Sequence, residues 1–395
     1  AVVLHLDIDH FRRINESFGR ELGNQVLRAV SKRLQQLLPL ETLHAHFGAD
    51  HFAALLPMGV AAHAQAEVER ILLGFAEALV LPQGKFYCNA SAGLALQAME
   101  TDADTWLMQA ELAVEQAKRD GRNRCHVYDD RLIEGAQNDA RLYLELRRAL
   151  EDHQLEVRYE PRVRMSDRTV AGFEALTRWK NPVLAAAPVE RTIRVAQESG
   201  LIRDLTREVL RQVSAHLASW RIAHGARVPC VSVNIPPAEF VAPGFIDLLQ
   251  QTLDRAGAPA SCLRVELVES TVMLQPDETR AVLHTLRARG IHASLDDFGT
   301  GFSSLASLHD LPVDEIKIDR SFMPVEMRPS SLSILRTIMT LATVLKLRTV
   351  IEGVETEAQH HLLLALGCDY AQGYLYSRAL EARTAGELFA SGKAV

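Results

Sequence analysis

Two different patterns of hydrophobic and polar positions divide the chain near Tyr128. Up to that point, short apolar runs alternate irregularly with stretches in which apolar residues recur every three or four positions. The runs predict strands and the three-to-four spacing predicts helices. The predicted strands are 1–6, 43–46, 52–56, 86–96 and one ending at Tyr128; the predicted helices run through Leu27 and Leu34, across 61–79 and across 103–118. This order predicts an α+β sandwich with antiparallel pairing.

The second pattern is regular and begins after residue 152. Residues 130–152 form a charged amphipathic pattern, which predicts a helix connecting two domains. Beyond it, short apolar runs alternate with longer helical patterns over the rest of the chain. The predicted strands lie near 155–159, 169–175, 230–235, 263–268, 291–295, 314–318, 348–351 and 371–375. Eight strands with intervening helices predict an α/β fold, a TIM-like (β/α)8 barrel.

Seven polar residues of this second region each stand at or near the carboxyl end of one apolar run. They are Glu174, Asn234, Glu266, Asp296, Lys317, Glu352 and Gln372. The carboxyl ends of parallel barrel strands meet at one mouth, so we expect these side chains to lie together. Any one of them alone is equally typical of an exposed loop or a helix cap, but seven in register favour a site.

The composition of this set indicates metal-assisted hydrolysis of a phosphate ester. Carboxylates gathered with an amide repel one another without a cation, and oxygen donors suit Mg²⁺ or Mn²⁺ better than zinc. Asp296 and Asp297 are adjacent, so one carboxylate could bridge two ions. Lys317 could orient the attacking water, and Glu352 could accept its proton.

Several short motifs of the second region resemble the motif series of the EAL domain family. The matching segments are Glu174-Ala175-Leu176, Arg178-Trp179, Val233-Asn234, Glu266-Leu267-Val268-Glu269-Ser270, Asp296-Asp297-Phe298-Gly299-Thr300-Gly301, Lys317-Ile318-Asp319, Glu352-Gly353-Val354-Glu355-Thr356 and Gln372-Gly373-Tyr374. The resemblance covers roughly residues 140–382. It implies a barrel phosphodiesterase that opens the bacterial second messenger cyclic di-GMP to linear pGpG with two Mg²⁺ or Mn²⁺ ions.

The same resemblance implies a role for each matching residue. The implied metal ligands are Glu174, Asn234, Glu266, Asp296 and Asp297. Lys317 and Glu352 would manage the nucleophilic water, and Glu269 would anchor the loop after Asp297. The implied substrate contacts are Arg178, Gln372, Glu160 and Leu176.

Three positions depart from the EAL pattern. Glu160 stands where the family usually has glutamine, Val268 replaces the usual threonine, and 184–188 replaces a glycine-rich loop. An added carboxylate near a dianionic ligand costs binding energy unless it is protonated or paired. None of the three removes an implied metal ligand.

The first region resembles a GGDEF domain, the family that makes cyclic di-GMP from two GTP. The matches over 1–129 are Asp7-Ile8-Asp9-His10-Phe11, Asn15, Ser91-Ala92-Gly93, Ala117-Lys118 and Gly121-Arg122-Asn123. The signature itself is altered, since it reads Gly48-Ala49-Asp50-His51-Phe52. Asn24 replaces an aspartate that recognises guanine, and Pro39 and Thr42 replace the residues of the inhibitory product site.

These changes predict a degenerate cyclase domain. Histidine in an acidic position makes a poorer Mg²⁺ site. Residues that could still contact GTP remain: Asp7, Asn15, Asp50, Lys118 and Arg122. We therefore expect a nucleotide-cyclase-like domain over 1–129, a connecting helix over 130–152 through which bound GTP could act, and a phosphodiesterase barrel over 140–395.

Three functions compete on this basis. The leading interpretation is a phosphodiesterase specific for cyclic di-GMP with a regulatory, inactive cyclase domain. The alternative is a cyclic di-GMP sensor that does not hydrolyse its ligand and signals to a protein partner. A bifunctional cyclase and hydrolase is disfavoured by Ala49, His51 and Asn24. The resemblance also implies a homodimer, for which 332–345 is either the surface or a core-facing helix.

Composition and charge exclude several other classes. A net charge of −7, from 43 Lys plus Arg against 50 Asp plus Glu, argues against binding of duplex nucleic acid. Five scattered cysteines without a CxxC pair signal neither a disulfide framework nor a thiolate zinc site. No apolar segment is long enough to span a membrane. We expect a cytoplasmic location, and a start on a strand without methionine suggests a missing upstream part that could tether the whole protein to the membrane.

Overall fold

The computed structural model of the chain describes all residues except 41, 58–62, 97–101, 226, 300–309 and 324–328. It divides into two compact units, Ala1–Arg141 and Leu142–Val395. Each unit has its own hydrophobic core, made of residues from that unit. The two units are described separately below.

The first unit is built on a five-stranded sheet in the order β2-β3-β1-β6-β7. Its strands are β1 (Val2–Ile8), β2 (Leu43–Gly48), β3 (His51–Leu56), β6 (Ala90–Leu96) and β7 (Cys125–Val127). The central strand β1 pairs antiparallel with both β3 and β6, and only β7 joins in parallel. The mainly antiparallel sheet confirms the expected α+β class.

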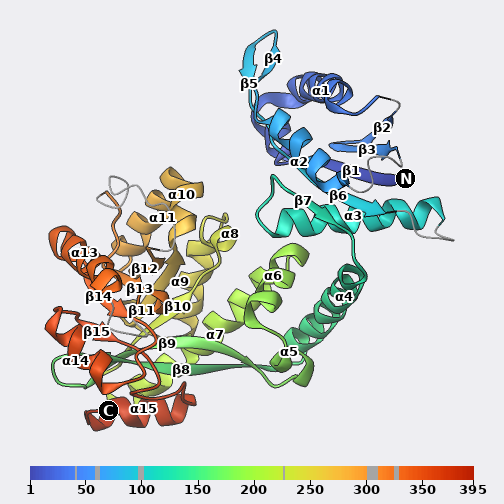
Figure 1. Ribbon diagram of the computed structural model, residues 1–395. Coiled ribbons are helices and arrows are strands. Elements are labelled where there is room, and N and C mark those ends of the chain that lie inside the picture. The colour runs from blue at the N-terminus through green and yellow to red at the C-terminus, as the bar shows by residue number, and fades with distance from the viewer. Residues whose placement is uncertain (41, 58–62, 97–101, 226, 300–309, 324–328) are drawn as a thin grey trace. The chain divides into compact units, whose positions relative to one another are not determined.

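Helices cover both faces of this sheet (Figure 1). They are α1 (Phe11–Leu37), α2 (Ala64–Phe75) and α3 (Ala103–Arg119). Residues of α1 and α2 pack on Leu4, Leu6 and Phe52 to form the core, and α3 lies on the other face against Gly93. One expectation was wrong: the apolar run 86–96 is not one strand. A separate hairpin, β4 (Leu79–Leu81) and β5 (Gly84–Phe86), ends before β6 begins.

The second unit is a closed barrel of eight strands, in the order β10-β11-β12-β13-β14-β15-β8-β9. Its strands are β8 (Leu155–Arg164), β9 (Val170–Trp179), β10 (Cys230–Asn234), β11 (Leu263–Val268), β12 (His292–Phe298), β13 (Glu315–Ile318), β14 (Arg348–Ile351) and β15 (Tyr370–Ala371). This confirms the eight-stranded barrel. The helix α4 (Asp130–Glu151) precedes it, and its Leu142 and Leu146 belong to the barrel core.

The remaining helices surround the barrel (Figure 1). They are α5 (Pro182–Ala186), α6 (Val189–Ser199), α7 (Ile202–His224), α8 (Pro237–Phe240), α9 (Phe245–Ala256), α10 (Glu269–Leu274), α11 (Pro276–Ala288), α13 (Pro329–Leu345), α14 (Glu357–Ala365) and α15 (Ala382–Ser391), with short 3₁₀ turns at Ala260–Cys262 and Arg320–Phe322. In the part of the chain that the structure describes, none of the helices has the length and apolar character to cross a membrane.

One strand departs from an all-parallel barrel. β8 runs antiparallel to both of its neighbours, β9 and β15, and a short turn instead of a helix joins β8 to β9. In that turn the Asp167 carboxylate accepts hydrogen bonds from the backbone and the hydroxyl of Thr169. The reversal places Glu160 directly opposite Glu174.

The helix α13 contains the segment considered for dimerisation. Leu335, Ile338 and Met339 are buried in the barrel core, whereas Ile334 and Val344 are 52% and 71% exposed. The core-facing interpretation therefore holds for one side of the helix, and two apolar side chains remain on the outer side.

Candidate active site

The predicted strand-end residues meet inside the mouth of the barrel. Glu174 lies within β9, Asn234 ends β10 and Glu266 lies near the end of β11; Asp296 and Lys317 follow on β12 and β13, and Glu352 and Gln372 directly follow β14 and β15. The parallel strands bring these ends to one edge of the sheet. The structure thus gathers the whole set that the sequence singles out.

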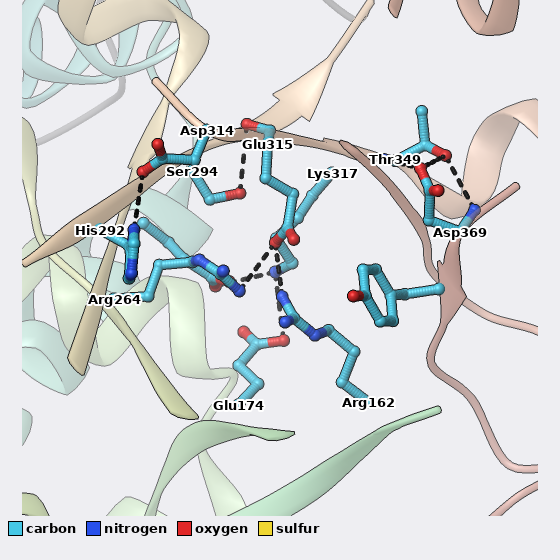
Figure 2. Close-up of polar contacts among 12 residues, drawn as sticks. Arg162, Glu174, Arg264, His292, Ser294, Asp314, Glu315, Lys317, Thr349 and Asp369 are labelled. Carbon is cyan, nitrogen blue, oxygen red and sulfur yellow. Dashed lines mark hydrogen bonds and ion pairs between the residues drawn. The ribbon is translucent and has the colours of Figure 1, made fainter. Parts of the chain in front are cut away.

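Lys317 is the centre of the set. Its side chain is 1% exposed, and Nζ lies 3.1 Å from Glu174 Oε2 and 2.9 Å from Glu266 Oε2. The same nitrogen lies 3.2 Å from Asp296 Oδ1 and 2.6 Å from Glu352 Oε1. Figure 2 shows Lys317 reaching Glu174 across the barrel interior. One ammonium therefore contacts four carboxylates in a site sheltered from water.

The four carboxylates outnumber the single ammonium, and this excess of negative charge shifts the pKa values of the residues at the mouth. Burial lowers the pKa of Lys317, but the four carboxylates outweigh it and raise that pKa well above its ordinary value. Burial raises the pKa of Glu266 to about 8 and that of Glu352 to about 7, since the neighbouring carboxylates add to it and Lys317 compensates only in part. The mouth carries more negative charge than one lysine neutralises.

Glu174 is held by two amides. Asn234 Nδ2 donates to Glu174 Oε1 at 2.7 Å, and Gln372 Nε2 donates to Glu174 Oε2 at 2.9 Å. Although burial opposes it, Lys317 and these hydrogen bonds lower the pKa of Glu174. Gln372 is 3% exposed and its side chain contacts Glu174, whereas the resemblance implied a contact with substrate.

Asp297 and Glu269 shape the end of β12. Asp297 is exposed and has a left-handed backbone, φ 53°, a conformation that aspartate tolerates better than most residues. Its backbone N–H donates to Asp296 Oδ1 at 3.0 Å. Burial and then Asp296 raise the pKa of Asp297. Glu269 is 4% exposed and accepts from the Gly299 N–H at 3.0 Å, while the rest of the loop it was expected to anchor, residues 300–309, lies outside the described residues.

Two cavities flank the carboxylates. One of about 520 Å³ is lined by Arg178, Leu176 and Asp297 together with apolar residues of α6 and α7. The other, of about 400 Å³, is lined by Glu160, Leu176 and Gln372. Arg178 is exposed, and its Nη1 donates to the backbone oxygen of Thr177 at 2.8 Å. All four implied substrate contacts therefore line a cavity at the mouth.

The sequence interpretation missed two cationic side chains of these cavities. Arg194, on α6, lines the larger cavity, and Arg320, two residues after β13, lines the smaller one. Arg320 follows the Lys317-Ile318-Asp319 motif, a signal that could have found it. Arg194 lies on a helix whose spacing gives no such signal.

A second polar group lies deeper in the barrel and was also missed. Arg162 Nη1 and Arg264 Nη1 lie 2.6 Å and 3.1 Å from Glu315 Oε1. Figure 2 shows the two guanidinium groups approaching one carboxylate from β8 and β11. Glu315 is fully buried and the two arginines are at most 5% exposed, so three charges from three strands meet below the mouth in the buried interior.

The donors at the mouth fit a hard divalent cation. Glu174, Glu266 and Asp296 supply carboxylate oxygens, Asn234 supplies an amide, and Asp297 lies next to them. Oxygen donors in this number are typical of Mg²⁺ and Mn²⁺ sites. The raised pKa values of Glu266 and Glu352 show that added positive charge would stabilise the group.

The first unit brings together only part of its predicted nucleotide residues. Lys118 Nζ donates to Asp7 Oδ2 at 2.8 Å, and His51 Nδ1 lies 3.1 Å from the same oxygen. One ligand atom from each of Asp7, Asp50 and His51 lies within 4.8 Å of the others. Asn15 lies on α1 against Gly23, and Arg122 lies in the exposed turn after α3.

Comparison with known proteins agrees with this architecture. The family model of the EAL domain matches residues 144–379, and that of the diguanylate cyclase GGDEF domain matches residues 1–124. The chain therefore belongs to the EAL domain family and carries a GGDEF domain before the barrel.

Relatives and solved structures share both parts or the barrel alone. The cyclic di-GMP phosphodiesterase NbdA of Pseudomonas aeruginosa is 35% identical over 96% of this chain and 48% of its own length. The bifunctional diguanylate cyclase/cyclic di-GMP phosphodiesterase MucR of the same organism is 32% identical over 96% of this chain and 56% of its own length. The chain thus spans about half of these relatives. The PaMucR phosphodiesterase structure, a c-di-GMP complex, is 35% identical with a TM-score of 0.59, covering 62% of this chain and 99% of that one.

Proposed function

We propose that the barrel is a metal-dependent phosphodiesterase that opens cyclic di-GMP to linear pGpG. The observation that carries the proposal is the buried Lys317 ammonium among four carboxylates, with a cavity on either side. The names of NbdA and MucR, both phosphodiesterases of this dinucleotide, support the choice of substrate. An EAL barrel solved with c-di-GMP supports it further.

The residues of the mouth divide into ligands and water-handling groups. Glu174, Asn234, Glu266, Asp296 and Asp297 would hold two Mg²⁺ or Mn²⁺ ions. Bound ions would neutralise charge on the phosphate and lower the pKa of a bound water. Lys317 would orient that water and stabilise charge developing on the phosphate, and Glu352, 2.6 Å from Lys317, would accept the proton. Glu269 would position Asp297 through the Gly299 backbone.

The two cavities would receive the two halves of the substrate. Arg178 would meet a phosphate in the larger cavity, and Leu176 would contact both halves since it lines both cavities. Glu160 and Gln372 would border the smaller cavity, with Gln372 acting through Glu174.

The proposal assigns the first unit a regulatory role without cyclase activity. It divides the chain into a GGDEF domain over 1–129, a connecting helix over 130–152 and a barrel domain over 140–395. Asp7, Asp50 and Lys118 lie together, and with Asn15 and Arg122 they would bind GTP without turnover. The helix α4, which runs from the first unit into the barrel core, would transmit the effect.

A chromatographic time course tests the proposal. Purified protein with Mg²⁺ or Mn²⁺ should convert cyclic di-GMP to pGpG, and Glu174→Ala should abolish the product because it removes a carboxylate that contacts Lys317, Asn234 and Gln372. A matched control is Glu387→Ala, an exposed carboxylate of α15 paired with Arg383, which should leave the rate unchanged. Addition of GTP should change the rate without yielding cyclic di-GMP.

Each failure has a distinct meaning. Binding of cyclic di-GMP without pGpG in either metal would replace the enzyme by the sensor alternative. Synthesis of cyclic di-GMP from GTP alone would contradict the inactive first unit, and MucR, which is bifunctional, shows that a relative has both activities. No GTP binding by calorimetry at millimolar nucleotide would remove the GTP role.

Assembly and location complete the proposal. A homodimer through the exposed side of α13, where Ile334 and Val344 lie, should appear in light scattering and be lost in the Ile334→Asp and Val344→Asp double variant. A cytoplasmic location is proposed because all five cysteines are free thiols and the nucleotide ligands are cytoplasmic.

A further inference from the structure

The altered signature of the first unit places one imidazole, His51, at a position where the GGDEF signature has an acid. Asp7 on β1 pairs with His51 on β3, so their side chains point to the same face of the sheet. Asp50 precedes His51, and its Oδ1 lies 3.8 Å from His51 Nε2. The three residues offer ligand atoms within 4.8 Å of one another.

A second histidine lies beside this group. His5 is two residues before Asp7 on β1, and the alternation of side chains along a strand puts both on the face covered by α3. Its ring lies against that of His51, with centroids 5.4 Å apart. His5 is 6% exposed, and among the described residues neither of its ring nitrogens has a hydrogen-bond partner.

A buried imidazole without partners needs an explanation. Buried polar groups are nearly always hydrogen-bonded, because an unpaired one loses its hydration for nothing in return. His51 Nδ1 is likewise buried and makes no hydrogen bond of good geometry within the described structure. A ligand that accepts electron pairs from both rings would satisfy them together.

The mixture of imidazole and carboxylate donors indicates which class of metal ion would bind here. Mg²⁺ takes oxygen ligands, and the residues present do not fit it, since two of the four donors are imidazoles. Imidazole with carboxylate suits borderline transition metals, of which Zn²⁺ is the most common. Ligands about 2.1 Å from one ion lie up to about 4.2 Å apart, so small rotations of Asp50 and His51, which are partly exposed, close the distance.

We propose that the first unit binds a borderline transition metal ion of the Zn²⁺ class through Asp7, Asp50 and His51, with the adjoining His5 as a fourth donor, in place of a nucleotide-bound Mg²⁺. Lys118 competes with the ion because its ammonium lies 2.8 Å from Asp7 Oδ2. Glu115, 3.1 Å from Lys118 Nζ, offers the ammonium an alternative partner when the metal binds. The site would therefore be selective for the metal class and only moderate in affinity.

Zinc titration of the full chain tests this assignment. The protein carries Glu174→Ala and Asp296→Ala, which remove the barrel's own metal ligands, and Zn²⁺ and Mg²⁺ are titrated separately by calorimetry. One Zn²⁺ should bind per chain, with Mg²⁺ much weaker. His51→Ala and His5→Ala should each weaken Zn²⁺ by at least roughly 10-fold. Lys118→Met should tighten it, by roughly 10-fold, because a competing charge is removed.

Further variants separate loss of ligands from loss of fold. His51→Glu should lower the ratio of Zn²⁺ to Mg²⁺ affinity by at least roughly 10-fold while the protein still binds metal. His126→Ala, a histidine of the same unit paired with Asp120, should change nothing. Binding that survives His51→Ala and His5→Ala would overturn the proposal. So would binding that disappears with the exposed pair His44→Ala and His46→Ala on β2, and so would equal affinity for Mg²⁺ and Zn²⁺.

Discussion

At the scale of single residues, one lysine contacts all four carboxylates gathered at the mouth of the barrel. The four carboxylates around Lys317 are drawn together by a single buried ammonium, a pairing whose Coulomb gain must offset the desolvation of every member. The gain is incomplete, because Glu266 and Glu352 have raised pKa values despite their contacts with Lys317. Bound divalent cations would neutralise the negative charge that Lys317 leaves uncompensated.

Glu160 adds to the negative charge at the mouth, so we expect its removal to strengthen the binding of cyclic di-GMP. It lies opposite Glu174, and burial together with Glu174 raises the pKa of Glu160. Glu160→Gln removes a like charge beside the substrate phosphates, so KM for cyclic di-GMP should fall by roughly two- to fivefold with kcat little changed. Steady-state kinetics with Glu387→Gln as control measures this. An unchanged or higher KM would show that Glu160 is already protonated or contacts the substrate productively.

His216 predicts how the barrel responds to acid. Burial and then Arg211 lower the pKa of His216, and its Nδ1 lies 2.7 Å from the hydroxyl of the fully buried Tyr159. The unfolded chain has the ordinary pKa of about 6.5, so it takes up a proton before the folded one does. Stability from this group is complete above about pH 6.5 and is lost as the pH falls toward the lower folded pKa.

The matching experiment is urea unfolding at pH 7, 6 and 5 in a chain with Trp106→Phe and Trp179→Phe, so that fluorescence reports Trp220, whose ring packs on Tyr159. His216→Gln cannot titrate, so the free energy of unfolding of the barrel should depend less on pH than in the unaltered protein. His224→Gln on the same helix serves as control. Equal pH dependence in His216→Gln and the unaltered chain would contradict the assignment.

At the scale of elements, the sequence predicted the strands well and their directions incompletely. Short apolar runs located all eight barrel strands, and closure of the barrel then gathers the polar residues that end seven of them, such as Asn234 and Glu352. The same apolar runs do not show whether a strand is parallel or antiparallel to its neighbours. The turn over 165–169 that reverses β8 depends on local hydrogen bonds of Asp167, and the hairpin β4–β5 depends on a break in an apolar run at 87–89.

The candidate site likewise contains some residues that the sequence could predict and others that it could not. Residues at strand ends could be predicted, because the fold alone brings those ends together. Arg162, Arg264 and Glu315 could not, because they occupy strand positions where apolar side chains are expected, and only the closed barrel shows that these positions face each other in its interior. Arg194 reaches its cavity from a helix, and its place depends on how α6 packs.

The buried group of Arg162, Arg264 and Glu315 predicts a large effect of one substitution. Glu315→Gln keeps the shape but leaves two buried guanidinium groups without a counter-charge, so the barrel should lose about 3–5 kcal/mol in its free energy of unfolding. Denaturant unfolding measures the loss. Glu387→Gln, in the exposed pair with Arg383, should cost at most about 0.5 kcal/mol. If Glu315→Gln lowers the free energy of unfolding no more than Glu387→Gln does, another group must neutralise the two arginines.

At the scale of the whole molecule, the chain consists of two units, and among the described residues their two hydrophobic cores share none. Leu4 and Phe52 belong to one core and Phe173 and Leu217 to the other. Cooperative unfolding follows the core, so each unit should unfold as its own transition. A change in one core should then leave the other transition in place.

Gly93 provides the matched perturbation of the first unit. A Cβ at this position would lie 2.1 Å from Ala110 O and 2.5 Å from Val114 N, so Gly93→Ala must push α3 away from β6. In scanning calorimetry we expect two transitions, with Gly93→Ala lowering only the first unit's by at least about 5 °C. Glu315→Gln should lower only the barrel's, and Mn²⁺ with cyclic di-GMP should raise only the barrel's, because a ligand stabilises the unit that binds it. A single transition that moves with all three changes would mean that the units unfold together, and α4, which enters the barrel core from the first unit, is then the element that couples them.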